Sequence, residues 1–168
     1  GENLSGKKVL LLGGGGAAKA IAFTLAKEVE ELILLNRTAE KARILAESLS
    51  SRFHKNIVSN MLTPGVLKKS LKDADIIINA TSVGMNQNIA QNLVKPKWLK
   101  PGLTVMDIVY SPIETKLVMD AKAAGAQVIS GVEMLIYQGA ASFEIWTGKP
   151  APIEVMRQAA LKQLAVSR

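Results

Sequence analysis

Residues 7–20 of the sequence read KKVLLLGGGGAAKA, and this stretch decides the fold. The apolar run from Val9 to Leu12 predicts a buried strand, and the glycines that follow it predict a tight turn. A helix is expected from about Gly16 to Glu28, and its candidates for inward-facing residues are Ala20, Phe23, Leu25 and Ala26. The stretch therefore predicts a strand, a turn and a helix in direct succession.

A phosphate-binding motif lies inside this stretch, because Gly13, Gly15 and Ala18 have the spacing G-x-G-x-x-A that is typical of dinucleotide-binding folds. Gly13 permits a turn in which a Cβ would force a disallowed backbone conformation. Gly15 lets a pyrophosphate approach the backbone, and Ala18 is small enough for the helix to lie against the strand. The pyrophosphate would then meet the free N–H groups and the positive dipole at the helix N-terminus. The cofactor contacts predicted for this turn are Gly13, Gly14, Gly15, Gly16, Ala17 and Ala18.

Four consecutive glycines are also compatible with a plain flexible loop. Three features favour the dinucleotide site instead: the apolar strand before the glycines, the Ala-rich helix after them, and a second apolar strand from Glu31 to Asn36. The number of residues between the two strands is the one that a strand–helix–strand unit requires.

The composition is that of a single α/β domain. Of the 168 residues, 48% are hydrophobic and 21% are charged, and Ala, Leu, Ile and Val rather than aromatic residues supply the packing. The absence of cysteine excludes disulfides, thiolate catalysis and cysteine-ligated metals. No apolar stretch approaches the ~20 residues needed to span a bilayer, and the N-terminal residues do not have the pattern of a signal peptide. We expect a cytoplasmic protein without a metal site or a membrane partner.

The net charge of +7, from 21 Lys and Arg against 14 Asp and Glu, raises nucleic-acid binding as an alternative. The basic residues are scattered over the expected helices and chain ends, without a dense block and without interleaved aromatics. Solvated helix faces and a few contacts to an anionic dinucleotide account for this charge, so no nucleic-acid partner is predicted.

Strands and helices are expected to alternate along the chain. The expected strands span residues 9–12, 31–36, 56–60, 75–79, 103–108 and 126–129. The expected helices span residues 16–28, 38–51, a short segment from 64, 114–124, 132–146 and 153–165, and residues 80–100 are expected to form a long functional loop with one helical turn near Trp98. This order predicts a Rossmann-like, doubly wound α/β fold with a mainly parallel six-stranded sheet and helices on both faces. Residues 1–168 would form one domain that the last two helices close.

Polar residues and glycine follow several of the expected strands. Gly13, Asn36, Asn79 and Tyr110 all lie at or just after a strand end. Ligands of open parallel sheets bind at the carboxyl ends of the strands. The sequence therefore predicts one binding site at this edge of the sheet.

The residues after the second strand indicate which dinucleotide binds. An NAD site usually has an acidic residue here for the ribose 2′-OH, but this chain has Asn36, followed by Arg37, Thr38 and, one helical turn on, Lys41. Arg37 and Lys41 would attract a 2′-phosphate, and Asn36 and Thr38 can donate hydrogen bonds to it. The alternative is that Thr38 caps the next helix while the two cations are ordinary surface charges, and Thr38 can do both. The pattern favours NADP over NAD.

Taken together, these residues resemble the shikimate dehydrogenase family, and specifically its C-terminal NADP-binding domain, over nearly the whole chain. Five motifs in order carry the resemblance: GGGGAAKA at 13–20, NRTAEKA at 36–42, NATSVGM at 79–85, DIVYSPIET at 107–115 and GVEMLIYQGAASFEIWTG at 131–148. The resemblance implies reversible, NADPH-dependent reduction of 3-dehydroshikimate to shikimate, in the pathway to aromatic amino acids.

The resemblance also implies roles for single residues. It adds Asn79, Thr81, Ser82, Val109, Gly131 and Met134 to the cofactor contacts, with Gly131 and Met134 beside the nicotinamide. It places Tyr110 near the substrate carboxylate and Gln138 at the substrate hydroxyls, roles that a phenol and an amide can fill. Without the family pattern, Met134 is interpreted as ordinary core and Gln138 as a polar helix residue.

The family carries its catalytic Lys–Asp pair upstream of the glycine turn, in an N-terminal domain that we expect to be missing from this chain. No catalytic residue is therefore predicted here. His54 is expected on the surface, and Asp107 is expected to be structural. We expect NADP binding with negligible turnover, and binding of the small-molecule substrate only together with the missing domain.

Two alternatives stay open: a stand-alone, non-catalytic NADP-binding module, and the cofactor domain of a related quinate/shikimate dehydrogenase. The last two helices are expected to be only partly covered, because their family counterparts pack toward the missing domain. An apolar patch around Ile136, Phe143 and Trp146 could then drive self-association.

Overall fold

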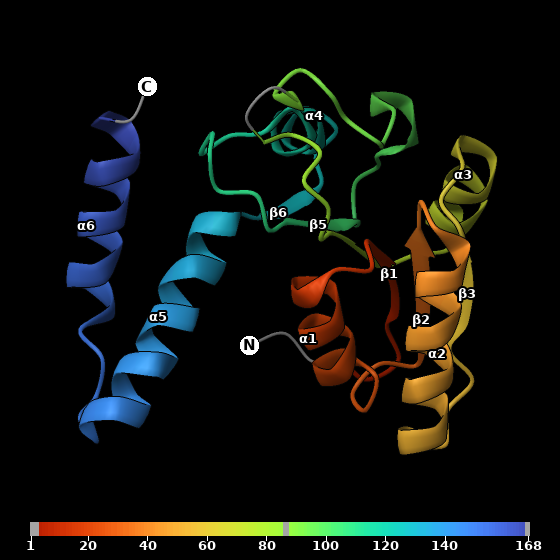
Figure 1. The fold of residues 1–168 in the computed structure, drawn as a ribbon. Coiled ribbons are helices and arrows are strands. Elements are labelled where there is room, and N and C mark those ends of the chain that lie inside the picture. The colour runs from red at the N-terminus through yellow and green to blue at the C-terminus, as the bar shows by residue number, and fades with distance from the viewer. Residues whose placement is uncertain (1–3, 86–87, 167–168) are drawn as a thin grey trace.

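The computed structural model describes residues 4–85 and 88–166 and contains one six-stranded sheet flanked by helices (Figure 1). The strands are β1 (Lys8–Leu12), β2 (Glu31–Asn36), β3 (Val58–Met61), β4 (Ile76–Asn79), β5 (Thr104–Asp107) and β6 (Gln127–Ile129). The helices are α1 (Gly16–Leu25), α2 (Ala39–Phe53), α3 (Pro64–Lys72), the 3-10 turn η2 (Pro96–Trp98), α4 (Lys116–Ala123), α5 (Gly131–Thr147) and α6 (Ile153–Val166). The alternation predicted from the sequence is confirmed, with boundaries that differ by a few residues.

The strand order is β3-β2-β1-β4-β5-β6, and every pair of neighbouring strands is parallel. This is the order of a doubly wound dinucleotide-binding sheet. The chain moves outward from β1 to β3 on one side and then from β4 to β6 on the other. The direction of winding therefore reverses between β1 and β4, and the crevice for a ligand is expected at the carboxyl ends of these two strands.

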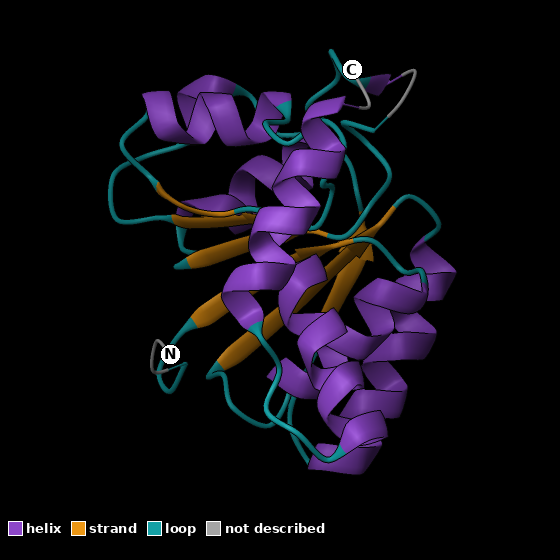
Figure 2. Cartoon of the chain, turned by 90° about the vertical axis from the view of Figure 1, so that its left-hand side faces the viewer, coloured by secondary structure: helices purple, strands orange, loops and turns teal. Residues whose placement is uncertain are grey.

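The sheet separates two apolar cores because successive strand side chains point to opposite faces. Val9 and Leu11 of β1 pack in the core that α1 and α2 cover, while Leu10 and Leu12 pack in the core that α3 and α4 cover. Figure 2 shows the sheet lying between helices. A strand buried on both faces needs a continuous apolar run. The apolar runs of β1, β2 and β4 therefore predict these strands directly from the sequence.

Local sequence chemistry fixes several helix ends. Thr63 accepts a hydrogen bond from the N–H of Val66 at 3.3 Å, and Pro64 occupies the first turn of α3, where its missing N–H costs nothing. Thr115 caps α4 in the same way through Val118. Gly125, with φ of +74°, follows the end of α4. The helix stop expected at this glycine is confirmed.

The helices α5 and α6 pack against each other at one side of the molecule (Figure 1). Arg157 of α6 donates two hydrogen bonds of 2.9 Å to the carboxylate of Glu133 on α5. This bidentate contact holds the pKa of Glu133 below its ordinary value. A Cβ on Gly139 would stand 3.0 Å from the terminal methyl of Met156, so the two helices approach closely at this glycine.

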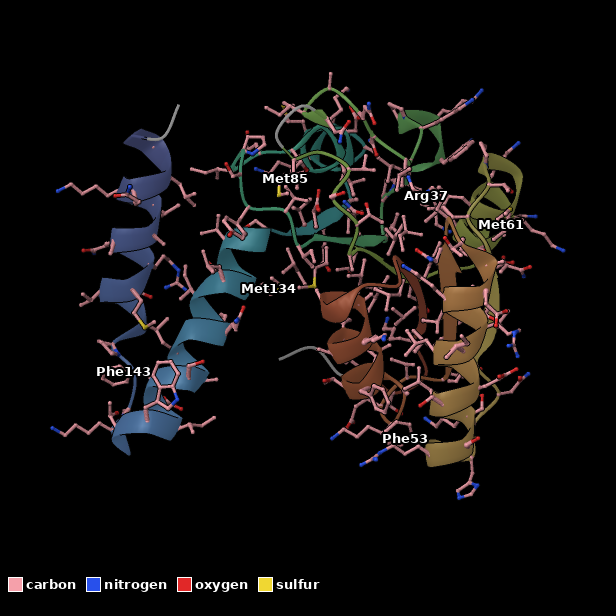
Figure 3. All side chains as sticks on the ribbon, in the orientation of Figure 1. Arg37, Phe53, Met61, Met85, Met134 and Phe143 are labelled. Atoms are coloured by element: carbon pink, nitrogen blue, oxygen red, sulfur yellow. The ribbon has the colours of Figure 1, made fainter. Side chains whose placement is uncertain are left out.

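Two sequence expectations about helix faces were wrong. Ile136 is buried, because it shares an inward stripe of α5 with Val132 and Ala140, whereas Trp146 is 82% exposed and its neighbour Ile145 is 81% exposed. Phe143 is half-buried on the α6 side of α5 (Figure 3). In α1 the expected inward residue Ala20 is exposed, and Ala18 and Ala22 face the core instead.

Candidate functional site

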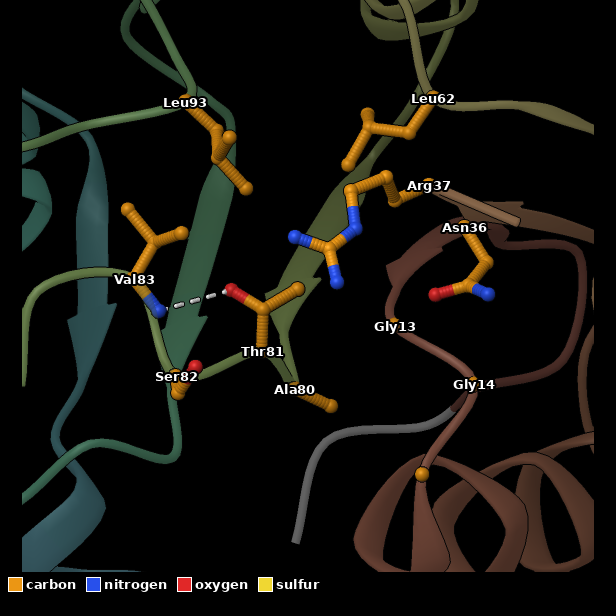
Figure 4. Close-up of a pocket in the computed structure, with 11 residues that line it drawn as sticks. Gly13, Gly14, Asn36, Arg37, Leu62, Ala80, Thr81, Ser82, Val83 and Leu93 are labelled. Carbon is orange, nitrogen blue, oxygen red and sulfur yellow. Dashed lines mark hydrogen bonds between the residues drawn. The ribbon is translucent and has the colours of Figure 1, made fainter.

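A cavity of about 440 Å³ opens at the carboxyl edge of the sheet (Figure 4). Its walls come from the segments that follow β1, β2, β3 and β4, so it occupies the crevice where the winding reverses. The lining residues that the sequence predicted are Gly13, Gly14, Gly15, Asn36, Arg37, Thr81 and Ser82. The lining residues that it missed are Leu62, Ala80, Val83 and Leu93.

The glycine turn has the geometry that the motif requires. Gly13 has φ of +121°, and a Cβ there would stand 2.5 Å from the carbonyl oxygen of Ala80, so no other residue fits. Its N–H donates to the carbonyl of Leu35 at 2.8 Å, which fixes the turn to β2. Gly15 precedes α1, and a Cβ there would meet no protein atom within 4 Å. Ala18 is fully buried against the sheet.

The N-terminus of α1 is open to an anion. Gly15 occupies the N-cap position, no side chain accepts a hydrogen bond from the first N–H groups of the helix, and the first turn contains no acidic residue. Gly16 and Ala17 are exposed at this turn. The unpaired N–H groups and the positive end of the helix dipole favour a negatively charged group here.

The end of β2 contributes the charged residue of the cavity. The guanidinium of Arg37 points into the cavity (Figure 4), and no described residue forms an ion pair or hydrogen bond with it. The amide nitrogen of Asn36 donates to the carbonyl of Thr38 at 3.0 Å, which orients the amide against Gly14. Thr38 occupies the N-cap position of α2 as predicted, but its hydroxyl makes no cap hydrogen bond. Lys41 faces a neighbouring groove and not this cavity.

The loop after β4 is held by the buried side chain of Asn79. Its amide oxygen accepts hydrogen bonds from the N–H and the hydroxyl of Thr81, at 3.2 and 2.7 Å. Its amide nitrogen donates to the carbonyl of Val83 at 3.2 Å and to Asp107 at 2.9 Å. Asn79 therefore shapes the loop, whereas Thr81 and the exposed Ser82 face the cavity.

Asp107 joins this loop to the one after β5. The carboxylate is fully buried and accepts from Asn79 Nδ2 at 2.9 Å, the N–H of Val109 at 3.1 Å and the hydroxyl of Thr115 at 2.6 Å. No cation is bound to it within the part of the chain that is described. Burial raises the pKa of the Asp107 carboxyl above its ordinary value, and the three hydrogen bonds oppose this rise.

Five of the residues that the resemblance implies for the cofactor or the substrate lie outside the 440 Å³ cavity: Val109, Tyr110, Gly131, Met134 and Gln138. Val109 is buried beside Asp107, and Tyr110 is 39% exposed directly after it. Gly131 begins α5 so close to the previous loop that a Cβ would stand 2.5 Å from the carbonyl oxygen of Val109. Met134 projects from α5 on the side away from α6 (Figure 3), and Gln138 is exposed one turn later.

The residues that form the apolar walls of the cavity were difficult to predict from the sequence. Leu62 follows β3, and its N–H donates to the carbonyl of Asn36 at 3.0 Å, which brings it beside the end of β2. Leu93 comes from the long loop before η2, where the sequence has no periodicity. A residue after a strand end can be proposed for a site, but the path of an irregular loop depends on tertiary contacts.

The described residues contain neither a metal-binding cluster nor a membrane-spanning helix. No group of histidine, cysteine or acidic residues there could hold a metal ion, and His54 is exposed at the end of α2. None of the helices in these residues has the length and hydropathy of a bilayer span. Among the described residues that line the cavity, Arg37 alone carries a charge, and none has a side chain that exchanges protons near neutral pH.

Two family profiles match the sequence. A profile described as Shikimate / quinate 5-dehydrogenase matches residues 1–122, and one described as Shikimate 5'-dehydrogenase C-terminal domain matches residues 131–161. The chain is 45% identical over 161 residues to the shikimate dehydrogenase (NADP(+)) of Methanosarcina acetivorans. The alignment covers 96% of this chain and 57% of that protein, so the chain spans somewhat more than half of the relative's length.

Solved structures agree with these profiles. A shikimate dehydrogenase in complex with NADP+ superposes with a TM-score of 0.87 at 41% identity, over 95% of this chain and 55% of that one. The shikimate 5-dehydrogenase of Listeria monocytogenes, in complex with shikimate and NAD, also gives a TM-score of 0.87, at 31% identity over 94% of this chain and 57% of that one. A profile match over most of the sequence, together with the parallel sheet and its glycine turn, shows that the chain belongs to the shikimate / quinate 5-dehydrogenase family.

Proposed function

We propose that this chain is the NADP(H)-binding part of a shikimate dehydrogenase, the enzyme that reversibly reduces 3-dehydroshikimate to shikimate with NADPH. The observation that carries the proposal is the 440 Å³ cavity at the reversal point of the sheet, which joins an uncapped helix N-terminus to an unpaired arginine. The pyrophosphate would bind at Gly13–Ala18, where N–H groups replace its hydration.

The adenosine half would occupy the cavity itself. Leu62, Val83 and Leu93 offer apolar contacts to an adenine ring, and the planar guanidinium of Arg37, at the end of β2, would bind the 2′-phosphate of the adenosine ribose from the cavity side. Asn36 and Thr38 would bind the ribose and its 2′-phosphate. Relatives of this chain have been solved with NADP+ and with NAD, so the choice of cofactor rests on these residues. The absence of a carboxylate at the end of β2 supports NADP.

The nicotinamide half would extend toward the loops after β4 and β5. We assign Thr81, Ser82, Val109, Gly131 and Met134 to this half, with Asn79 acting through the loop that it holds. Tyr110 and Gln138 are exposed in the same part of the chain and are assigned to the substrate. When bound, NADPH supplies the hydride, and these residues set its position.

We further propose that the 168 residues alone turn over negligible substrate. Reduction of a carbonyl needs a proton as well as a hydride, and no described residue of the cavity has a side chain suited to deliver one. The remaining substrate contacts and the acid–base pair would then be supplied by additional polypeptide. The cytoplasmic location expected from the composition stays a prediction.

Isothermal titration calorimetry with NADPH and NADH tests the proposal. The chain should bind NADPH more tightly than NADH. Replacing Arg37 by Asp should weaken NADPH by about tenfold or more, since it removes an attraction and adds a repulsion, while NADH changes little. A folded chain without heat of association with NADPH would overturn the proposal.

A turnover assay separates the three functions that are compatible with the family match. Restored shikimate oxidation on adding the N-terminal domain of a relative identifies the chain as the cofactor part of an enzyme. NADPH binding without restored turnover identifies a non-catalytic NADP-binding module. Preference for quinate in that assay would identify the related quinate dehydrogenase.

A further inference from the structure

A second cavity, of about 310 Å³, lies between α1 and α2 and meets the first at Gly14, which lines both. Its lining residues are Gly14, Lys19, Phe23, Lys41, Ile44, Leu45 and Ser48. The four from α2 have the spacing of one helix face, and the two from α1 come from the facing helix. Both charged residues of this α1–α2 groove are lysines, one from each helix.

The positive charge of the groove is not neutralised by neighbouring side chains. Within residues 4–85 and 88–166, neither Lys19 nor Lys41 forms an ion pair. The acidic residues of α2, Glu40 and Glu47, are both bound by Arg43, at 2.6 Å for Glu40. The positive end of the α2 dipole adds to the field at the same place. The groove is therefore suited to bind an anion at the end where it meets the first cavity, at Gly14.

The position of Asn36, where a ribose would bind, indicates which anion fits the groove. The amide of Asn36 lies against Gly14, with its carbon 3.0 Å from the point where a Cβ of Gly14 would stand. Asn36 thus lies at the boundary between the two cavities. The guanidinium of Arg37 points into the first cavity (Figure 4), whereas Lys19 and Lys41 line the second. A ribose bound at Asn36 and Gly14 would therefore lie at this boundary, with its 2′ substituent near the two lysines.

We propose that Lys19 is a specificity-determining residue, which together with Lys41 binds the ribose 2′-phosphomonoester at the mouth of the α1–α2 groove. The inference rests on the proposed NADP-binding function and adds a residue that the glycine motif does not require to be basic. Two ammonium groups match a phosphate dianion in charge, and each can donate to a different phosphate oxygen. Phe23, Ile44 and Leu45 form the apolar part of the groove, and both lysines are exposed, so a phosphate can reach them from solvent.

Replacing Lys19 by Gln tests this role, because Gln keeps a polar side chain of similar length and removes the charge. The dissociation constant of NADP+ should rise about three- to tenfold, and that of NAD+ should change by less than about twofold. The difference should shrink as ionic strength rises. Adenosine 2′,5′-bisphosphate and adenosine 5′-diphosphate provide a comparison at similar charge, and Lys19→Gln should weaken only the first.

The matched control is Lys69→Gln on α3, which removes the same charge from the opposite face of the sheet and should leave both affinities unchanged. Circular dichroism and the thermal midpoint show whether each variant is folded. Equal weakening of NADP+ and NAD+ by Lys19→Gln, or no weakening, overturns the inference while wild-type binding of NADP+ keeps the proposed function. Absence of NADP+ binding by the folded wild-type chain overturns both.

Discussion

At the scale of single residues, Asp107 links the loops of the site region, in the structural role expected from the sequence. It is a fully buried carboxylate that three donors stabilise and no described cation neutralises. Burial raises the pKa of its carboxyl in the folded protein above the unfolded value. Its contribution to stability is therefore complete below the unfolded pKa and is lost as pH rises through the folded pKa.

Replacing Asp107 by Asn should remove this pH dependence. The Asn oxygen can accept from Asn79 and Val109, and its NH₂ can donate to the hydroxyl of Thr115. The free energy of unfolding of the variant, measured relative to that of the wild type, should increase as pH rises from about 4 to 7. Urea unfolding at several pH values measures the difference.

Asp107→Ala serves as the contrasting variant. It leaves buried donors without an acceptor and should cost about 3 kcal/mol at neutral pH, at 1–3 kcal/mol for each unsatisfied group after local relaxation. If Asp107→Asn retained the wild-type pH profile, the carboxyl would not be the group responsible.

The sequence predicted the residues of the cavity whose role depends on local geometry or charge. Gly13 could be predicted because the turn itself demands a positive φ, and Arg37 because it follows a strand end. Leu62 and Leu93 could not, because any apolar residue looks like core until the fold places it on a cavity wall. Lys19 was missed because a lysine on a helix is usually an ordinary surface charge.

At the scale of secondary-structure elements, the junction between β5 and α5 depends on one missing side chain. A Cβ on Gly131 would stand 2.5 Å from the carbonyl oxygen of Val109 and 2.6 Å from that of Ile108. Backbone atoms cannot move aside as a flexible side chain can. The start of α5 is therefore fixed against the loop that contains Val109 and Tyr110.

Replacing Gly131 by Ala should destabilise the protein by about 2 kcal/mol or more, because the backbones of the loop and the helix must separate. Gly65→Ala in the first turn of α3 is the matched control. A Cβ there meets no atom within 4 Å, so the change should be neutral or stabilise by about 0.5–1 kcal/mol. Thermal unfolding of both variants gives the comparison, and equal midpoints would contradict the assignment.

Helix faces were harder to predict than helices. α1 has alanine at five of the positions from 17 to 26, so its inward and outward faces differ little in hydropathy, and Ala20 was wrongly assigned to the core. In α5 apolar residues occupy both sides, so periodicity did not show that Ile136 is buried and Ile145 is exposed. By contrast, the continuous apolar runs of β1, β2 and β4 are compatible only with buried strands. The parallel sheet could therefore be predicted from them.

At the scale of the whole molecule, the helix pair α5–α6 exposes apolar surface to solvent. Tyr137, Ile145, Trp146 and Val155 are all more than half exposed. Exposed aromatic and aliphatic side chains on neighbouring helices favour association. The self-association expected from the sequence stays a prediction, with Trp146 exposed as expected and Ile145 in place of the buried Ile136.

Sedimentation velocity over a range of concentrations measures this association. The sedimentation coefficient should rise with concentration for the wild type and stay constant for an Ile145→Glu/Trp146→Glu double variant, whose positions are exposed enough to leave folding intact. A wild type that remains monomeric at every concentration would contradict the prediction.

β1 is hydrogen-bonded on both sides, to β2 and β4, and its residues from Val9 onward are buried up to the glycine turn. The segment that would carry the diphosphate is thus continuous with a buried strand that is paired on both sides. The residues assigned to the nicotinamide and the substrate include three on α5, whose main packing partner is α6. In the proposed assignment, retention of the cofactor would depend mainly on the glycine turn, whereas the substrate would contact α5, so substitutions on α5 would change substrate preference with little effect on cofactor affinity.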